Sequence, residues 1–84
     1  MAKIVMYTKA DCPYCHLAKD LLTQRGAEFT EIRIDLDDSQ REEMMRRSQR
    51  RTVPQIFIND EPIGGYDDLA QLARSGKLND LLNT

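Results

Sequence analysis

The chain has 84 residues, of which 40% are hydrophobic and 31% are charged, and its formal net charge is −2. This length predicts one domain, residues 1–84, and the composition is typical of a globular protein rather than a disordered one. The charge balance gives no reason to expect a nucleic-acid or membrane partner, and no apolar run approaches the roughly 20 residues of a membrane span.

The first half of the chain alternates strand and helix patterns. Residues 3–8 are β-branched and aromatic and predict a buried strand. From Pro13, apolar residues recur on one helical face until Gly26, which is expected to end that helix. Residues 29–34 alternate apolar and polar side chains and predict a second strand, and 37–50 predict a polar helix.

The second half begins with the pattern of a β-hairpin. Residues 55–58 and 62–64 predict two strands joined by a tight turn at 59–60. Pro62 indicates that the second of these strands lies at a sheet edge, because proline cannot donate to a ladder. Leucines after Gly76 predict a last short helix.

Short polar motifs predict where two helices begin. Ser39 with Glu42 has the spacing of a capping box, and Asp67 or Asp68 is expected to cap a third helix. The element order is β-α-β-α-β-β-α, in which a helical crossover makes the first two strands parallel. We therefore expect an α/β fold, with one mixed four-stranded sheet and helices on both faces.

The N-terminal segment MAKIVMYTK lacks the apolar core and the small-residue cleavage site of a signal peptide. We therefore expect a cytoplasmic protein. In that reducing compartment, two cysteines are typically reactive or metal-binding rather than a structural staple.

The motif DCPYCH at residues 11–16 carries the chemistry, and it fits three kinds of site. Haem attachment is disfavoured, because the chain has one histidine and no tryptophan. Cys12, Cys15 and His16 cannot complete a four-ligand zinc site alone, so only a zinc site shared between two chains stays open. The two cysteines could also be small buried hydrophobic residues with no reactive role, although a loop-to-helix junction is a poor place for such residues.

Redox chemistry needs no further ligands. If Cys12 is the N-cap, Pro13 suits the first helical position, and the N–H groups of Tyr14 and Cys15 point at the sulfur. The helix dipole and Lys9, three residues upstream, favour the thiolate and so lower the pKa of the Cys12 thiol. Cys15 lies one turn along the same face and should be more buried. The pattern predicts that Cys12 attacks and Cys15 resolves.

Three motifs together resemble the dithiol glutaredoxins, above all the short bacterial type numbered three. They are CPYC at 12–15, TVP at 52–54 and GGYDDL at 64–69, and the resemblance covers essentially the whole chain. It implies a thioredoxin-like fold and a glutathione-dependent enzyme that reduces protein disulfides and protein–glutathione mixed disulfides. It implies glutathione as co-substrate and no permanently bound cofactor.

The resemblance also implies where glutathione binds. Pro54 is expected to be a cis proline beside the disulfide, so that the Val53 backbone pairs with the cysteine of glutathione. The γ-glutamyl end is expected at residues 65–68, at a helix N-terminus, and the glycyl carboxylate near Lys9. Tyr14 is expected to wall the disulfide. The implied contact residues are Lys9, Tyr14, Thr52, Val53, Pro54, Gly65, Tyr66, Asp67 and Asp68.

A basic cluster ends the second predicted helix and contains Arg46, Arg47, Arg50 and Arg51. Its simplest interpretation is a solvated face that complements the helix dipole. The alternative is attraction of anionic glutathione, with Arg51 nearest the TVP motif.

Two other function classes fit part of the pattern. An iron–sulfur carrier would share a cluster between two chains through Cys12 and glutathione, but Pro13 and Cys15 depart from the single-cysteine motif of relatives built for that role. A redoxin that depends on thioredoxin reductase should lack the glutathione-binding residues. We expect a monomer, and ribonucleotide reductase is a partner that the family admits but no residue here selects.

Overall fold

One mixed four-stranded sheet organises the computed structural model, which describes residues 2–83. The elements in chain order are β1 (Ile4–Thr8), α1 (Pro13–Gln24), β2 (Thr30–Arg33), α2 (Asp38–Ser48), β3 (Gln55–Ile58), β4 (Glu61–Gly64), α3 (Tyr66–Ser75) and α4 (Lys77–Leu82). The predicted order is confirmed, and α4 is the short last helix. Strand β2 is shorter than the predicted 29–34.

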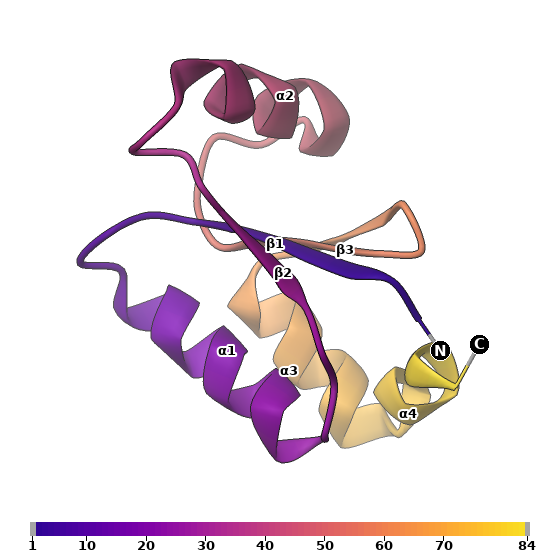
Figure 1. Cartoon of the computed structure of the whole chain (residues 1–84). Helices are drawn as coiled ribbons and strands as arrows, with labels where there is room; N and C mark the ends of the chain where they lie inside the picture. Colours follow the sequence, from indigo (N-terminus) through magenta and orange to yellow (C-terminus); the bar gives the residue numbers. More distant parts are fainter. Residues whose placement is uncertain (1, 84) are drawn as a thin grey trace.

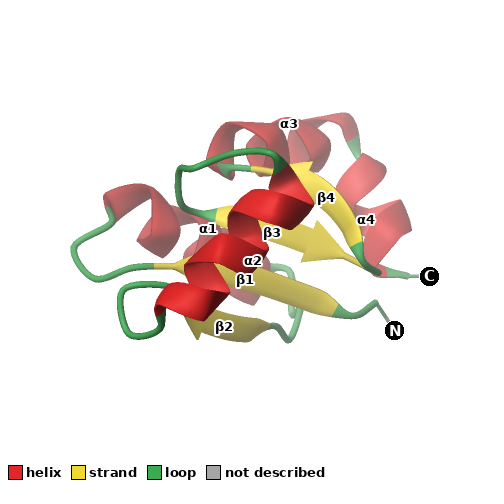
Figure 2. Cartoon of the chain, turned by 90° about the horizontal axis from the view of Figure 1, so that it is seen from above, coloured by secondary structure: helices red, strands yellow, loops and turns green. Residues whose placement is uncertain are grey.

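The strands lie in the order β2-β1-β3-β4, which Figure 2 shows from above. Strand β1 pairs parallel with β2 and antiparallel with β3, and β3 pairs antiparallel with β4. The hairpin turn has positive φ at both central residues, 52° at Asn59 and 68° at Asp60, as a type I′ turn requires. Pro62 lies in β4 at the sheet edge, as predicted.

Helices cover both faces of the sheet. Helix α2 lies on one face, and α1, α3 and α4 lie on the other (Figure 1). Between the sheet and the three helices lies a core of Ile4, Met6, Ala18, Leu22, Ile56, Ile58, Leu69 and Leu78. Between the sheet and α2 lies a smaller core of Tyr7, Ile34, Met44 and Phe57. Within residues 2–83, no helix combines the length and the apolar character needed to span a bilayer.

The predicted N-cap positions of α2 and α3 are wrong, although Asp68 does contribute a capping interaction. The N-cap of α2 is Asp37, whose carboxylate accepts the Ser39 N–H at 2.9 Å. Asp37 reaches this N–H from two residues upstream, so the helix begins before the predicted Ser39 box. The N-cap of α3 is Gly65, and Asp68 acts from inside the first turn, where its carboxylate accepts the Gly65 N–H at 3.0 Å.

The C-cap of helix α2 is Gln49, which has left-handed backbone geometry with φ 61°. A side chain in this region costs about 1 kcal/mol, a cost that glycine avoids. We expect Gln49→Gly to stabilise the protein by about 0.5 kcal/mol and to raise the melting temperature by about 2–4 °C. Gln49→Ala is the matched control, since it keeps the strained φ and loses the bond from Gln49 Nε2 to the Arg46 carbonyl. Thermal unfolding of the three proteins checks this, and a less stable glycine variant would contradict it.

Candidate functional site

A disulfide joins Cys12 and Cys15 at the start of α1, with 5.2 Å between their Cα atoms. Cys12 is the N-cap, and its sulfur accepts the Cys15 N–H at 3.2 Å. This is the predicted geometry, which follows from a cysteine directly before a proline at the first helical position. Cys15 is 1% exposed and Cys12 is 6% exposed, so the predicted order of burial is also confirmed.

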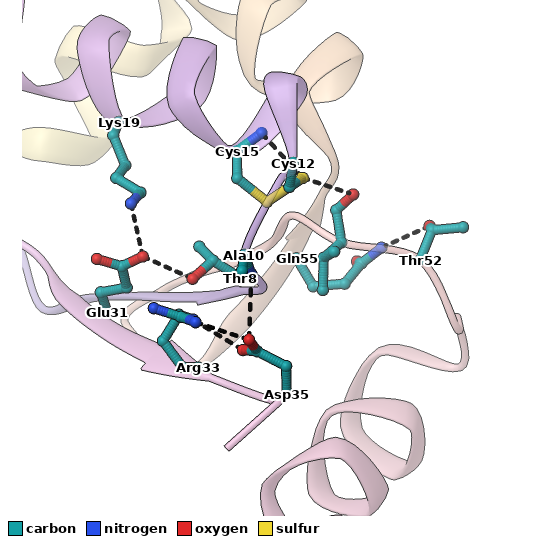
Figure 3. Close-up of a disulfide and its surroundings, with 11 residues drawn as sticks. Thr8, Ala10, Cys12, Cys15, Lys19, Glu31, Arg33, Asp35, Thr52 and Gln55 are labelled. Atoms are coloured by element: carbon teal, nitrogen blue, oxygen red, sulfur yellow. Dashed lines mark hydrogen bonds and ion pairs between the residues drawn. A yellow bond between two sulfur atoms is a disulfide. The ribbon is translucent and has the colours of Figure 1, made fainter. Parts of the chain in front are cut away.

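The loop before β3 lies against the Cys12 sulfur. The Val53–Pro54 peptide bond is cis, as the resemblance implies, and Pro54 is buried. The Cys12 Sγ atom lies 3.8 Å from the Val53 carbonyl oxygen. Buried Gln55 donates from Nε2 to the Thr52 hydroxyl at 3.3 Å, an interaction that Figure 3 shows beside the disulfide. Gln55 therefore supports this loop, a role that its strand-like sequence context did not indicate.

A cavity of about 410 Å³ lies on the α2 side of this loop. Three cations, Lys9, Arg41 and Arg51, line it alongside the carboxylates of Asp35 and Asp38. The remaining lining residues are Ile34, Thr52 and Val53. The cavity thus joins the predicted residues Lys9, Thr52 and Val53 to Arg41, which lies near the start of a polar helix and which no sequence motif distinguishes. A surplus of positive charge beside Val53 suits a carboxylate ligand.

The loop that carries Lys9 is tied to the end of β2. Asp35 accepts the Ala10 N–H at 3.3 Å and a two-pronged pair of bonds from Arg33 at 2.7 and 2.6 Å. The Arg33 guanidinium holds the pKa of the Asp35 carboxyl well below its usual range. Figure 3 shows this clamp beneath the disulfide. Because Asp35 is already paired with Arg33, it reduces the positive charge of the cavity less than its formal charge suggests.

The start of α3 forms the other side of the site. Asp68 Oδ2 accepts the Gly65 N–H at 3.0 Å and the Arg50 guanidinium at 3.0 Å. The Gly65 N–H, followed by Arg50, lowers the pKa of the Asp68 carboxyl. A Cβ on Gly65 would lie 3.4 Å from the Pro54 carbonyl oxygen, so this segment passes close to the cis-proline loop.

Two aromatic rings flank the site. The Tyr14 and Tyr66 centroids lie 5.9 Å apart with the rings tilted by 32°. Tyr14 is 59% exposed, so its ring presents a surface at the rim rather than filling the core. Asp67, between Tyr66 and Asp68, is also exposed. The predicted residues from α1 and α3 therefore meet at one rim.

A polar network lies under α1 near the disulfide (Figure 3). Glu31 Oε2 accepts the hydroxyl of Thr8 at 2.6 Å and pairs with Lys19 Nζ at 2.6 Å. Thr8 is fully buried, and Lys19 lies one helical turn after Cys15. The bonds from Lys19 and then Thr8 lower the pKa of the Glu31 carboxyl.

This lowered pKa predicts a pH-dependent contribution to stability. The folded pKa of Glu31 lies below its unfolded value of about 4.5, so ionised Glu31 stabilises the fold above that pH and loses the contribution as pH falls through the folded pKa. We expect Glu31→Gln to cost about 1 kcal/mol at pH 7 and progressively less below about pH 5. Urea unfolding at pH 7, 5, 4 and 3 checks this, with the exposed Glu28→Gln as control. A cost that does not change with pH would contradict it.

Within residues 2–83, no group of three or more His, Cys, Asp or Glu side chains is arranged to hold a metal ion. The site described above consists of a disulfide, a backbone segment at Val53, a cationic cavity and a helix N-terminus.

Comparisons with known proteins agree on one family. Residues 4–63 match the family model of glutaredoxin. Glutaredoxin 3 of Escherichia coli K12 is 54% identical over 82 residues, which cover 98% of this chain and 99% of the relative. Glutaredoxin of Pseudomonas aeruginosa is 47% identical over 83 residues, which cover 99% of each chain.

Solved structures agree on the fold. The solution structure of glutaredoxin from Brucella melitensis superposes with a TM-score of 0.86 at 49% identity, covering 98% of this chain and 89% of the other. The crystal structure of a buckwheat glutaredoxin–glutathione complex gives a TM-score of 0.90 at 33% identity, covering 98% and 77%. The fold is therefore thioredoxin-like, as the resemblance implied.

Proposed function

The chain belongs to the glutaredoxin family of glutathione-dependent thiol–disulfide oxidoreductases, and we propose how its own residues divide that reaction. One observation carries the proposal: the Cys12 sulfur caps α1, accepts the Cys15 N–H at 3.2 Å and lies 3.8 Å from the Val53 carbonyl oxygen. The helix N-terminus favours the Cys12 thiolate once the disulfide is reduced. Cys12 is therefore the nucleophile, and Cys15 is the resolving cysteine.

With a protein–glutathione mixed disulfide, the Cys12 thiolate attacks the glutathione sulfur. The protein leaves as a thiolate and takes up a proton, and glutathione stays on Cys12 as a mixed disulfide. A second glutathione thiolate attacks the sulfur of the bound glutathione. This step forms glutathione disulfide and regenerates the Cys12 thiolate.

With a protein disulfide, Cys12 first forms a mixed disulfide with one sulfur of the substrate. The Cys15 thiolate then attacks the Cys12 sulfur, which releases the reduced protein and forms the disulfide of the present structure. Two glutathione molecules reopen this disulfide in turn and leave as glutathione disulfide. Holding the sulfurs within one turn of α1 makes the resolving step effectively intramolecular.

Glutathione is placed by three parts of the site. Its cysteine pairs with the Val53 backbone, and its glycyl carboxylate lies in the cavity of Lys9, Arg41 and Arg51. Its γ-glutamyl end lies at the start of α3 near Asp68, where backbone N–H groups of the helix can donate to a carboxylate. The complex of the buckwheat relative with glutathione supports glutathione as the ligand.

We further propose that the enzyme acts in the cytoplasm as a monomer, on proteins that carry disulfides or glutathione adducts. A reducing compartment supplies the glutathione that both routes consume. Ribonucleotide reductase is a protein partner that the family admits, and no residue of this chain selects it. Glutathione is a co-substrate, and no permanently bound cofactor takes part.

A coupled assay tests this function. Glutathione, glutathione reductase and NADPH are supplied with a small glutathione mixed disulfide, and NADPH oxidation is followed. We expect turnover that depends on both glutathione and the protein. Turnover only with thioredoxin reductase would replace the proposal with the redoxin alternative, and a visible absorption band lost on chelation would favour an iron–sulfur carrier.

A further inference from the structure

An ion pair closes the α3 side of the site, and the mechanism above does not use its cation. Arg50, in the loop after α2, donates from Nη1 to Asp68 Oδ2 at 3.0 Å. The same oxygen accepts the Gly65 N–H at 3.0 Å. The side chains of Arg50 and Asp68 are 52% and 44% exposed, so a dissolved ligand can reach both charges.

The backbone fixes where this pair lies. A Cβ on Gly64 would stand 2.2 Å from Asp68 Oδ2 and 3.0 Å from Arg50 Nη1. The two charged groups therefore rest against the Gly64 backbone, where only glycine leaves room for them. Gly65, next in the chain, approaches the Pro54 carbonyl, so the pair borders the loop beside the Cys12 sulfur.

A guanidinium beside a carboxylate is complementary to the zwitterionic end of an α-amino acid. The ammonium of such a ligand pairs with Asp68, and its α-carboxylate accepts parallel bonds from a guanidinium. The γ-glutamyl end of glutathione carries both groups on one carbon. A thiol that lacks this end has no ammonium for Asp68 and no α-carboxylate for Arg50.

We propose that Arg50 is a specificity-determining residue for the γ-glutamyl end of glutathione. In the free protein Arg50 is the counter-ion of Asp68. When glutathione binds, its ammonium takes that place on Asp68 and Arg50 pairs with its α-carboxylate. This inference rests on the proposed function, because it assigns a role within the same glutathione site.

The test isolates the first chemical step. Proteins carrying Cys15→Ser react in single turnover with mixed disulfides of an aromatic thiol, whose release is followed by absorbance. The tripeptide half is glutathione, glutaryl-Cys-Gly, which lacks the ammonium, or γ-aminobutyryl-Cys-Gly, which lacks the α-carboxylate. Attack falls on the tripeptide sulfur because the aromatic thiolate is the better leaving group.

We expect Arg50→Gln to lower the second-order rate constant about tenfold for glutathione and for glutaryl-Cys-Gly, and less than twofold for γ-aminobutyryl-Cys-Gly. Arg50→Lys should restore part of the loss, since it keeps the charge without the planar fork. The matched control is Arg46→Gln, which removes an exposed cation paired with Glu43 on α2. Arg46→Gln should change the second-order rate constant by less than twofold for each of the three substrates.

Three results would overturn the inference. An equal loss on all three substrates would make Arg50 a support for the start of α3. A faster reaction with glutathione would make Arg50 a competitor of the ammonium. A loss on γ-aminobutyryl-Cys-Gly alone would place Arg50 at another group. By contrast, a parent protein (Cys15→Ser) that reacts equally with all three tripeptides would refute recognition of glutathione itself. Failure of the proposed function is therefore distinguishable from failure of the Arg50 assignment.

Discussion

We expect Cys12→Ser to abolish the reduction of glutathione mixed disulfides and Cys15→Ser to leave it nearly intact. The first variant should lose at least about 1,000-fold in kcat/KM, because a serine hydroxyl is not ionised at neutral pH and cannot replace the thiolate. The second should stay within about threefold, because a second glutathione regenerates Cys12 without help from Cys15. Cys15→Ser should nevertheless fail on protein disulfides that need the resolving step.

Both substrates are measured in the coupled assay with the two single variants and the double variant. The double variant should behave like Cys12→Ser, because the effects of mutating two residues that act in sequence on one sulfur are not additive. Cys15 is buried at 1% exposure and Cys12 at 6%, so thermal unfolding of each variant must accompany the kinetics. Activity retained in Cys12→Ser and lost in Cys15→Ser would reverse the assigned roles.

Gly64→Ala is expected to cost about 3 kcal/mol of folding free energy, far more than alanine at another glycine of positive φ. Gly64 has φ +113°, and a Cβ there would lie 2.2 Å from Asp68 Oδ2 and 2.7 Å from its Cγ. The strained backbone contributes about 1–2 kcal/mol, and displacing Asp68 from the Gly65 N–H and Arg50 adds a similar amount. Gly76→Ala is the matched control, since Gly76 has φ +82° and an added Cβ would meet no described residue beyond its chain neighbours within 4 Å.

Urea unfolding of both variants measures the difference, and a double-variant cycle assigns its cause. In an Asp68→Ala background, Gly64→Ala should cost only about 1 kcal/mol, as Gly76→Ala does, because the displaced carboxylate is gone. The same full cost with and without Asp68 would show that backbone strain alone makes Gly64 necessary. In the coupled assay, Gly64→Ala should also raise KM for the glutathione mixed disulfide.

Local patterns were enough to predict the element order and the reactive end of α1. The run Cys12-Pro13 specifies an N-cap and a first helical residue by itself, and the structure has the Cys15 N–H on the Cys12 sulfur. The hairpin was equally local, since Asn59 and Asp60 both tolerate positive φ. The Ser39–Glu42 motif placed the start of α2 too late, because Asp37 is also a favourable N-cap residue and occupies that position.

Interactions between distant segments could not be predicted in this way. Arg50 and Asp68 are separated by 18 residues, and their pairing depends on how the loop after α2 meets the start of α3. Arg41 faces the cavity of Lys9 only because α2 crosses the sheet beside the loop before β3. In the sequence Arg41 belongs to a polar helix with no motif to distinguish it, and Arg50 is one of four arginines in a basic cluster that does not indicate which of them meets Asp68.

The first and last described residues lie together at the end of the molecule away from the start of α1 (Figure 1). Ala2, Leu82 and Asn83 line one cavity of about 580 Å³ there. This arrangement makes the domain a module for gene fusion, in which a reporter or a second enzyme joined at either end leaves the disulfide accessible. It also makes circular permutation feasible, because a short linker can join the ends without crossing the reactive face.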